Sequence, residues 1–173
     1  KTDNLKAFNL YAEGRHHWNL RIESELEKGI ECFKKALKED PGFTLAYTGL
    51  IDSWILLIKY GHTKQEELLP HCWKALHKAE ELGDTSAELY TSHGAILELE
   101  DKYEDAIEHY ITAIEQNPNY ATAHHWLAMQ YHSKHEYEKA IDQIEIAMTL
   151  DPKSAIIHYC GANINSDINN INR

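Results

Sequence analysis

The chain has 173 residues, of which 43% are hydrophobic and 26% charged, and its formal net charge at pH 7 is −11. This length suffices for one domain with a substantial core, and no apolar run approaches the roughly 18 residues that a membrane span needs. Nucleic-acid binding requires a basic surface. We therefore expect neither a nucleic-acid nor a membrane partner. Valine is absent and alternating strand-like runs are hard to find, which predicts an all-α fold.

The first half of the chain is predicted to form two long helical hairpins. Residues 6–43 place Gly14 where two helices approach closely. Residues 44–86 continue the same pattern with weaker matches. These segments exceed the length of the following hairpins by about three and about nine residues, which we expect within residues 15–24 and 60–70.

The second half contains a nearly regular repeat. Residues 87–120 and 121–154 are two 34-residue blocks that align without a gap. The aligned pairs are small, aromatic, alanine and proline residues: Gly94 with Ala128, Tyr103 with Tyr137, Ala106 with Ala140, Ala113 with Ala147, and Pro118 with Pro152. Small residues let two antiparallel helices approach closely, and proline stops the second helix. Such a unit cannot bury its apolar face alone and must stack on its neighbours.

These residues resemble the signature of the tetratricopeptide repeat (TPR) family, over residues 6–162. The resemblance implies a right-handed α-α superhelix, a TPR solenoid of about four helix–turn–helix repeats with a partial C-terminal helix. We therefore expect one solenoid over residues 1–162, whose partial helix spans 155–162. Residues 163–173 lose the periodicity and are predicted to form an asparagine-rich C-terminal tail or a truncated helix.

Four potential capping boxes mark expected helix starts. Each has Ser, Thr or Asp three residues before a glutamate: Ser24/Glu27, Thr63/Glu66, Asp101/Glu104 and Ser133/Glu136. The side-chain oxygen of such a residue can accept a hydrogen bond from a free N–H group of the first helical turn. We therefore expect the second helix of each hairpin to begin at these residues.

The cysteines and the first residue bear on the setting of the protein. Cys32, Cys72 and Cys160 are odd in number and form no CxxC pair, so we expect reduced thiols and a cytoplasmic protein. The chain begins with Lys1 and shows no signal peptide, so we expect a piece of a longer protein. The first hundred residues, including 11–18, are also similar to repeat segments appended to bacterial signalling proteins.

Negative charge is concentrated in one segment, where eleven acidic residues stand against one base, Lys102. We call this set the acidic flank; it comprises Glu80, Glu81, Asp84, Glu88, Glu98, Glu100, Asp101, Glu104, Asp105, Glu108 and Glu115. One interpretation is a solvated outer face of the third repeat. The other is a docking surface that attracts a basic partner through its field.

Twelve histidines raise the question of a metal site. His124, His125, His132 and His135 form the only dense group, and His125 and His132 lie two turns apart on one helix face. Structural zinc requires four ligands and catalytic zinc three, and the HExxH spacing is missing, so we assign no metal ligand. The sequence contains no catalytic or nucleotide-binding motif, and we expect no enzyme activity and no cofactor.

The family resemblance implies that the first helix of each hairpin lines a concave groove. The residues expected to bind a peptide in this groove are Tyr11, Arg15, Trp18, Thr48, Asp52, Thr91, Glu98, His125, Met129, His132 and Tyr159. Apolar anchors would supply most of the binding energy. For Met129 the alternative, packing between neighbouring first helices, is equally open.

Three hypotheses about function follow. The leading one is a non-enzymatic scaffold that binds a peptide or protein partner through the concave groove or the acidic flank, where the partner would be basic. The second is a regulatory or self-association module of a larger bacterial signalling protein, which would form homo-oligomers. The third is histidine-mediated metal binding.

Overall fold

The structure is a computed structural model that describes residues 2–171, with the side chains of residues 2–168. Over the described residues the chain forms nine α-helices and no strand, which confirms the predicted all-α class. The helices are α1 (Leu5–Asn19), α2 (Glu23–Glu39), α3 (Thr44–Lys59), α4 (Gln65–Glu81), α5 (Ala87–Leu99), α6 (Tyr103–Gln116), α7 (Ala121–Ser133), α8 (Tyr137–Leu150) and α9 (Ala155–Ile171).

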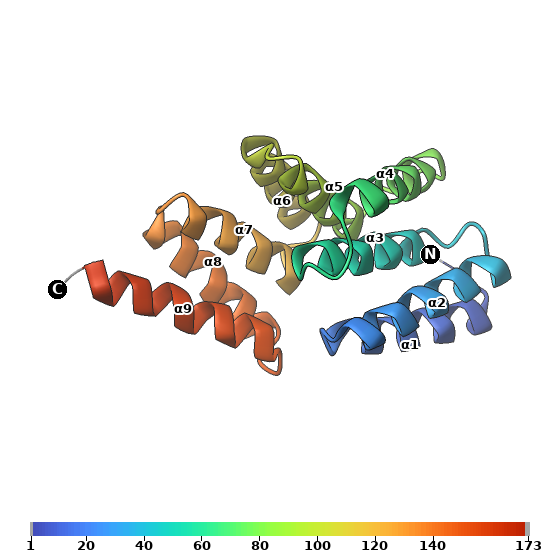
Figure 1. Cartoon of the computed structure of the whole chain (residues 1–173), viewed down its shortest axis with the longest axis horizontal. Helices are drawn as coiled ribbons and strands as arrows, with labels where there is room; N and C mark the ends of the chain where they lie inside the picture. Colours follow the sequence, from blue (N-terminus) through green and yellow to red (C-terminus); the bar gives the residue numbers. More distant parts are fainter. Residues whose placement is uncertain (1, 172–173) are drawn as a thin grey trace.

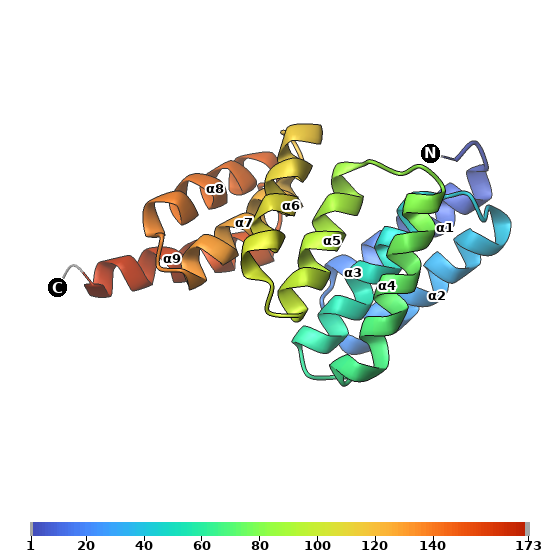
Figure 2. The ribbon, with the colours of Figure 1, turned by 90° about the horizontal axis from the view of Figure 1, so that it is seen from above.

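The helices pair into the hairpins α1–α2, α3–α4, α5–α6 and α7–α8, and α9 packs against α8. Each hairpin also packs against the next one, and the first helices α1, α3, α5, α7 and α9 contact one another in that order. Figure 1 shows the hairpins following one another along the molecule, and Figure 2 shows the same succession from above. The fold is therefore a helical-repeat solenoid, as the sequence predicts.

Glycines explain how the helices approach each other, at the predicted positions Gly14 and Gly94 and also at Gly49. A Cβ atom on Gly14 would lie 2.6 Å from the Phe33 ring, and one on Gly49 would lie equally close to the same ring. A Cβ atom on Gly94 would lie 2.7 Å from the Tyr110 ring. Since real Cβ atoms do not approach other atoms so closely, the aromatic rings occupy the space that the missing side chains leave.

Trp126 of α7 lies where several core clusters meet. It packs against a cluster of the first two hairpins that contains Trp18, and against a cluster of α3, α4 and α5 that contains Ile55. It also packs against the cluster around Tyr110 of the third hairpin. A side chain of the fourth hairpin thus packs against core clusters that the three preceding hairpins form.

The predicted capping boxes are wrong. The N-cap residues of α2, α4, α6 and α8 make no side-chain cap; they are Ile22, Lys64, Lys102 and Glu136. An N-cap residue needs extended backbone, whereas Arg21, Asp101 and His135, two positions before three of these helices, have φ values of 56°, 60° and 61°. Side-chain caps occur instead at Asn4 before α1 and Ser86 before α5.

The C-terminal helix is longer than expected. α9 continues without interruption from Ala155 to Ile171, past Ala162, where the sequence suggests that the repeat pattern ends. The last two residues of the expected tail, 172–173, lie outside the described residues, as does residue 1. Over the described part of the chain, every helix is too short or too polar to cross a membrane.

Candidate functional site

A charged network crosses the first helices of three successive hairpins. The Arg15 guanidinium of α1 donates a hydrogen bond of 2.8 Å to Oδ2 of Asp52 on α3. The other carboxylate oxygen of Asp52 accepts a hydrogen bond of 2.7 Å from the Ser92 hydroxyl of α5. Both oxygens of Asp52 are therefore engaged, and the network holds the three helices in register.

Tyrosines surround this network and influence its ionisation. Burial alone would lower the pKa of Arg15, but the nearby Tyr120, Asp52 and Tyr11 outweigh this effect and raise it. Burial raises the pKa of both Tyr11 and Tyr120. At neutral pH the inner wall therefore presents a charged guanidinium beside two protonated phenols.

A second network lies further along the inner wall. Lys59 at the end of α3 forms an ion pair of 2.6 Å with Glu98 of α5, and Glu98 also accepts a hydrogen bond of 3.0 Å from the Tyr110 hydroxyl. The Lys59 ammonium lies 3.9 Å from the centroid of the Trp126 ring, within the range of a cation–π contact. Burial lowers the pKa of Lys59, and the charge of Glu98 opposes that shift.

Arg21, in the turn between α1 and α2, differs from Arg15 and Lys59 in its lack of a carboxylate partner among the described residues. Its guanidinium carbon lies 3.8 Å from the centroid of the Trp18 ring, and that of Arg15 lies 4.0 Å from the same ring. Among the described residues Arg21 forms no ion pair, and its buried Nε has no hydrogen-bond partner. Burial lowers its pKa. A desolvated guanidinium without a carboxylate partner is a strong potential binding group for an anion.

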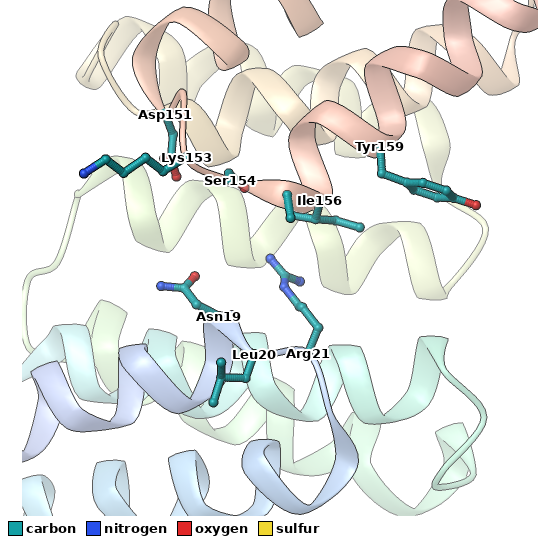
Figure 3. Close-up of a pocket in the computed structure, with 9 residues that line it drawn as sticks. Asn19, Leu20, Arg21, Asp151, Lys153, Ser154, Ile156 and Tyr159 are labelled. Carbon is teal, nitrogen blue, oxygen red and sulfur yellow. The ribbon is translucent and has the colours of Figure 1, made fainter.

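A cavity of about 540 Å³ lies beside Arg21, between the end of α1 and the start of α9. Figure 3 shows Arg21 extending from the α1–α2 turn toward Ile156 at the opposite wall. Tyr159, which lines the same cavity, is 63% exposed. The first and the last repeat thus face each other across a space lined by two cations (Arg21 and Lys153), one carboxylate (Asp151), the Tyr159 ring, and smaller polar and aliphatic side chains.

The structure divides the predicted groove residues into three groups. Four are buried instead of facing the groove: Trp18, Thr48, Thr91 and His125. Thr48 and Thr91 also donate their hydroxyl hydrogens to carbonyls of their own helices. Six are half-buried: Tyr11, Arg15, Asp52, Glu98, Met129 and His132. Of the eleven, only Tyr159 is exposed.

Two of the half-buried residues, Tyr11 and Met129, pack against other side chains of the solenoid. Tyr11 makes an edge contact with Phe43 at a ring-centroid distance of 5.2 Å. Met129 packs against the core cluster of the fourth hairpin and α9, around Ala128 and Ile144. Met129 therefore packs between helices, which is the alternative that the sequence left open.

The four histidines of the dense group do not converge on one point. His124 bonds to Gln143 and the Pro118 carbonyl, and His135 bonds to Tyr137. His125 Nε2 lies 3.3 Å from the Cys160 sulfur, and His132 Nε2 lies 2.9 Å from an Asp167 oxygen. Burial, with the charges of Arg21 and Lys59, lowers the pKa of His125 to about 4. In the described chain, no group of three potential metal ligands includes any of the four.

The acidic flank has a solvated part and an engaged part. Seven of its members are exposed: Glu80, Glu81, Asp101, Glu104, Asp105, Glu108 and Glu115. The other four are half-buried, and Glu98 is turned to the inner wall by Lys59. Glu100 accepts hydrogen bonds from Lys102 and from the Trp73 indole. The exposed members lie at the end of α4, in the α5–α6 turn and on α6.

Sequence reasoning missed Arg21, Lys59, Tyr120 and Trp126. Arg21 lies in the segment 15–24, where extra residues were expected, so no position of the standard repeat described it. Lys59 is the last residue of α3, which has 16 residues against 13 in α5 and α7. The unusual lengths of these segments were the available signal, because insertions in a solenoid alter one face locally.

Comparison with known proteins agrees with this architecture. Residues 94–134 match the family model described as "TPR repeat". No curated protein matches the chain in sequence. The fold and the matched segment define a helical-repeat protein, whose residues 94–134 carry a repeat of the tetratricopeptide family. Proteins of this family generally mediate protein–protein interactions and are typically not enzymes.

Three solved structures illustrate the similarity. A thermophilic TPR protein of Thermus thermophilus, TTC0263, is 18% identical with a TM-score of 0.72, and the match covers 94% of this chain and 82% of that one. YrrB, a TPR protein with an unusual peptide-binding site, is 20% identical with a TM-score of 0.51, covering 95% and 78%. MamA is 25% identical with a TM-score of 0.54, covering 84% and 80%.

Proposed function

We propose that this protein is a non-enzymatic scaffold that binds an extended segment of another polypeptide along its inner wall, ending in the cavity beside Arg21. The observation that carries the proposal is Arg21 itself, a half-buried cation that forms no ion pair among the described residues and lies beside an open cavity. Such a group costs free energy to desolvate, and a ligand carboxylate would recover it. The peptide-binding site named for YrrB gives a precedent within the same fold.

The lining of the cavity indicates the chemistry of the segment. Arg21 would pair with a carboxylate, either an acidic side chain or a chain terminus. Tyr159 and Ile156, on the opposite wall, would pack against an apolar or aromatic side chain. Arg15 is already paired with Asp52, and Lys59 with Glu98, so these cations would position the segment without supplying its main charge contact.

Peptide selection tests the proposal directly. Peptides selected from a random display library on the wild-type protein would be synthesised, and their affinities measured by fluorescence anisotropy. We expect Arg21→Gln and Tyr159→Ala each to weaken binding about tenfold or more, which corresponds to about 1.4 kcal/mol or more. Circular dichroism would verify that both variants fold.

The matched control is the double variant Asp105→Asn/Glu108→Gln, which changes exposed side chains of α6 only. Its affinity should equal that of the wild type. Selected peptides that bind equally well to the Arg21 and Tyr159 variants would contradict the proposal.

The acidic flank supports a second docking mode. Seven exposed carboxylates on neighbouring elements would attract a basic partner, with an affinity that decreases as salt screens the field. The affinity of a lysine-rich peptide, measured by fluorescence anisotropy at two salt concentrations, distinguishes docking on the acidic flank from binding along the inner wall. Loss of its binding in Asp105→Asn/Glu108→Gln, with normal binding in Tyr159→Ala, would place the basic partner on the flank.

Self-association is supported by the apolar surface of the first helix. Leu5 and Phe8 lie one turn apart on α1 and are 72% and 51% exposed. Exposed apolar side chains on the first helix of a solenoid can contact the last helix, here α9, of another copy head to tail. Sedimentation at two concentrations tests this mode: the sedimentation coefficient should rise with concentration in the wild type and stay constant in Leu5→Glu/Phe8→Glu.

The proposed setting is the cytoplasm. Cys32, Cys72 and Cys160 are buried and free of disulfides among the described residues. Burial raises the pKa of all three thiols. Such thiols suit a reducing compartment.

A further inference from the structure

We propose that Glu13 and His17 of α1 and Cys32 of α2 form a binding site for a divalent transition-metal ion, and that zinc is the ion that fits it best. One carboxylate oxygen of Glu13, one ring nitrogen of His17 and the sulfur of Cys32 all lie within 4.8 Å of one another. Thiolate, imidazole and carboxylate are the three ligand types that zinc uses in proteins.

The local structure explains why the three side chains meet. Glu13 and His17 are four residues apart, so they project from the same face of α1. A Cβ atom on Gly29 would lie 3.2 Å from the Gly14 carbonyl oxygen, so the absence of a side chain there lets α2 approach α1 closely. Cys32, one turn after Gly29, is thereby brought beside His17.

A carboxylate of α2 orients the imidazole of His17. Nδ1 of His17 lies 2.7 Å from Oε2 of Glu25, which as an ionised carboxylate can only accept a hydrogen bond. Lys28 holds the other oxygen of Glu25 at 2.6 Å. In the neutral ring, a proton on Nδ1 leaves the lone pair on Nε2, which lies 4.0 Å from an oxygen of Glu13. A histidine held through its second nitrogen by a carboxylate is the usual arrangement at protein metal sites.

The distances require only a small movement. Around a tetrahedral zinc ion with bonds of about 2.0–2.3 Å, the ligand atoms lie about 3.2–3.8 Å apart. The side chain of Glu13 is 58% exposed and can rotate to close the difference. Cys32 is buried, with 7% of its surface exposed. Water would complete the coordination.

The chain contains a second histidine–cysteine pair, which serves as the internal comparison. His125 and Cys160 lie 3.3 Å apart on the inner wall, closer than a bound ion requires. However, the charges of Arg21 and Lys59 act on His125 and would repel a cation. Among the described residues, no carboxylate lies close enough to His125 and Cys160 to form a group of three potential metal ligands with them. We therefore assign the ion to the first pair.

Titration of the reduced, untagged protein with Zn²⁺ in a calorimeter, and with Co²⁺ in a spectrophotometer, tests the site. We expect one equivalent of each ion to bind, with a near-ultraviolet thiolate-to-cobalt absorption band. Cys32→Ala should abolish the band and weaken zinc binding at least 100-fold. Glu13→Gln and Glu25→Gln should each weaken it about 10- to 100-fold. Cys160→Ala should bind like the wild type.

The variants separate loss of the site from loss of the fold. Glu13 is largely exposed, so Glu13→Gln should keep the wild-type melting temperature without metal while losing affinity. Zinc should raise the melting temperature of the wild type and of Cys160→Ala, because an ion that binds only the folded state stabilises it. Absence of binding by the wild type, unchanged binding by Cys32→Ala, or loss of the band in Cys160→Ala would each overturn the assignment.

Discussion

Arg15 of α1 and Asp52 of α3 form an ion pair of 2.8 Å in which only 22% and 13% of the side chains are exposed. Asp52 also accepts a hydrogen bond from Ser92, so one carboxylate links the first three hairpins. A partly desolvated carboxylate with two partners contributes to stability chiefly because its removal leaves those partners unsatisfied.

The first prediction follows from this network. Asp52→Ala leaves the Arg15 guanidinium and the Ser92 hydroxyl unpaired, and it should lower the free energy of unfolding by about 2–3 kcal/mol. Ser92→Ala removes only one hydrogen bond and should cost about 1 kcal/mol. Urea unfolding followed by circular dichroism measures both values. As the control, Asp105→Ala changes an exposed carboxylate and should stay within about 0.5 kcal/mol of the wild type. An Asp52→Ala protein as stable as that control would refute the role of the network.

The second prediction concerns pH. Burial lowers the pKa of His125 to about 4, and burial together with His109 and His77 lowers that of His93 to about 4. In the unfolded chain both histidines should titrate near about 6.5. Between these values the unfolded state binds more protons, so stability is complete above pH 6.5 and falls as the pH decreases toward 4.

Unfolding free energies at pH 7, 6 and 5 measure this effect. Each histidine should contribute a slope of up to about 1.4 kcal/mol per pH unit below pH 6. His125→Gln should reduce the slope, whereas His158→Gln, at an exposed position, should leave it unchanged. Equal slopes in the wild type and His125→Gln would show that His125 is not held neutral by the fold.

The third prediction uses the repeat itself. A Cβ atom on Gly94 would lie 2.7 Å from the Tyr110 ring and 3.0 Å from the Ala106 carbonyl oxygen. Gly94→Ala should therefore destabilise the protein by about 1–3 kcal/mol, although alanine favours a helix by about 1 kcal/mol over glycine. Thermal and urea unfolding would measure the loss.

The next repeat supplies the compensating change. The residues equivalent to Gly94 and Tyr110 there are Ala128 and Ile144, and both are buried without a ring at that position. Gly94→Ala/Tyr110→Ile should therefore lose less stability than the sum of the two single variants. Strict additivity would mean that the ring does not cause the strain.

The fourth prediction is that a surface ion pair contributes little. Lys134 bonds to Glu104 at 2.7 Å, but the two side chains are 33% and 75% exposed. Lys134→Ala should change the free energy of unfolding by less than about 1 kcal/mol, with a smaller effect at high salt. A loss comparable to that of Asp52→Ala would show that exposure does not separate the two kinds of pair.

The hairpins could be predicted from the sequence because their packing depends on few residues at fixed spacing. Gly94, Ala106 and Tyr110 recur as Ala128, Ala140 and Ile144, and each trio lies at a buried contact between two helices. Helix starts were harder to predict, because the turns use left-handed residues such as Asp101 and His135 in place of side-chain caps. The extension of α9 beyond Ala162 was hidden because asparagines interrupt the repeat pattern without breaking a helix.

The inner wall was less predictable than the fold. Repeat positions indicate which residues point inward, but burial depends on how the hairpins pack together, and Trp126 packs against the cluster of the first two hairpins that contains Trp18. Arg21 and Lys59 lie outside the regular repeat, so the repeat pattern does not predict where their side chains lie. The Glu13, His17 and Cys32 group joins two helices, and a search for ligands closely spaced along the chain could not find it.

The cavity beside Arg21 has one wall in the first repeat and the other in the last helix. Its width therefore depends on the curvature of the whole solenoid. A slight rotation at each junction between hairpins adds to the rotation at the next junction, and the total rotation determines the width of the cavity. A molecule wedged there would fix the pitch at every junction at once. Occupancy at one end could thus stiffen surfaces far from the ligand, including the acidic flank.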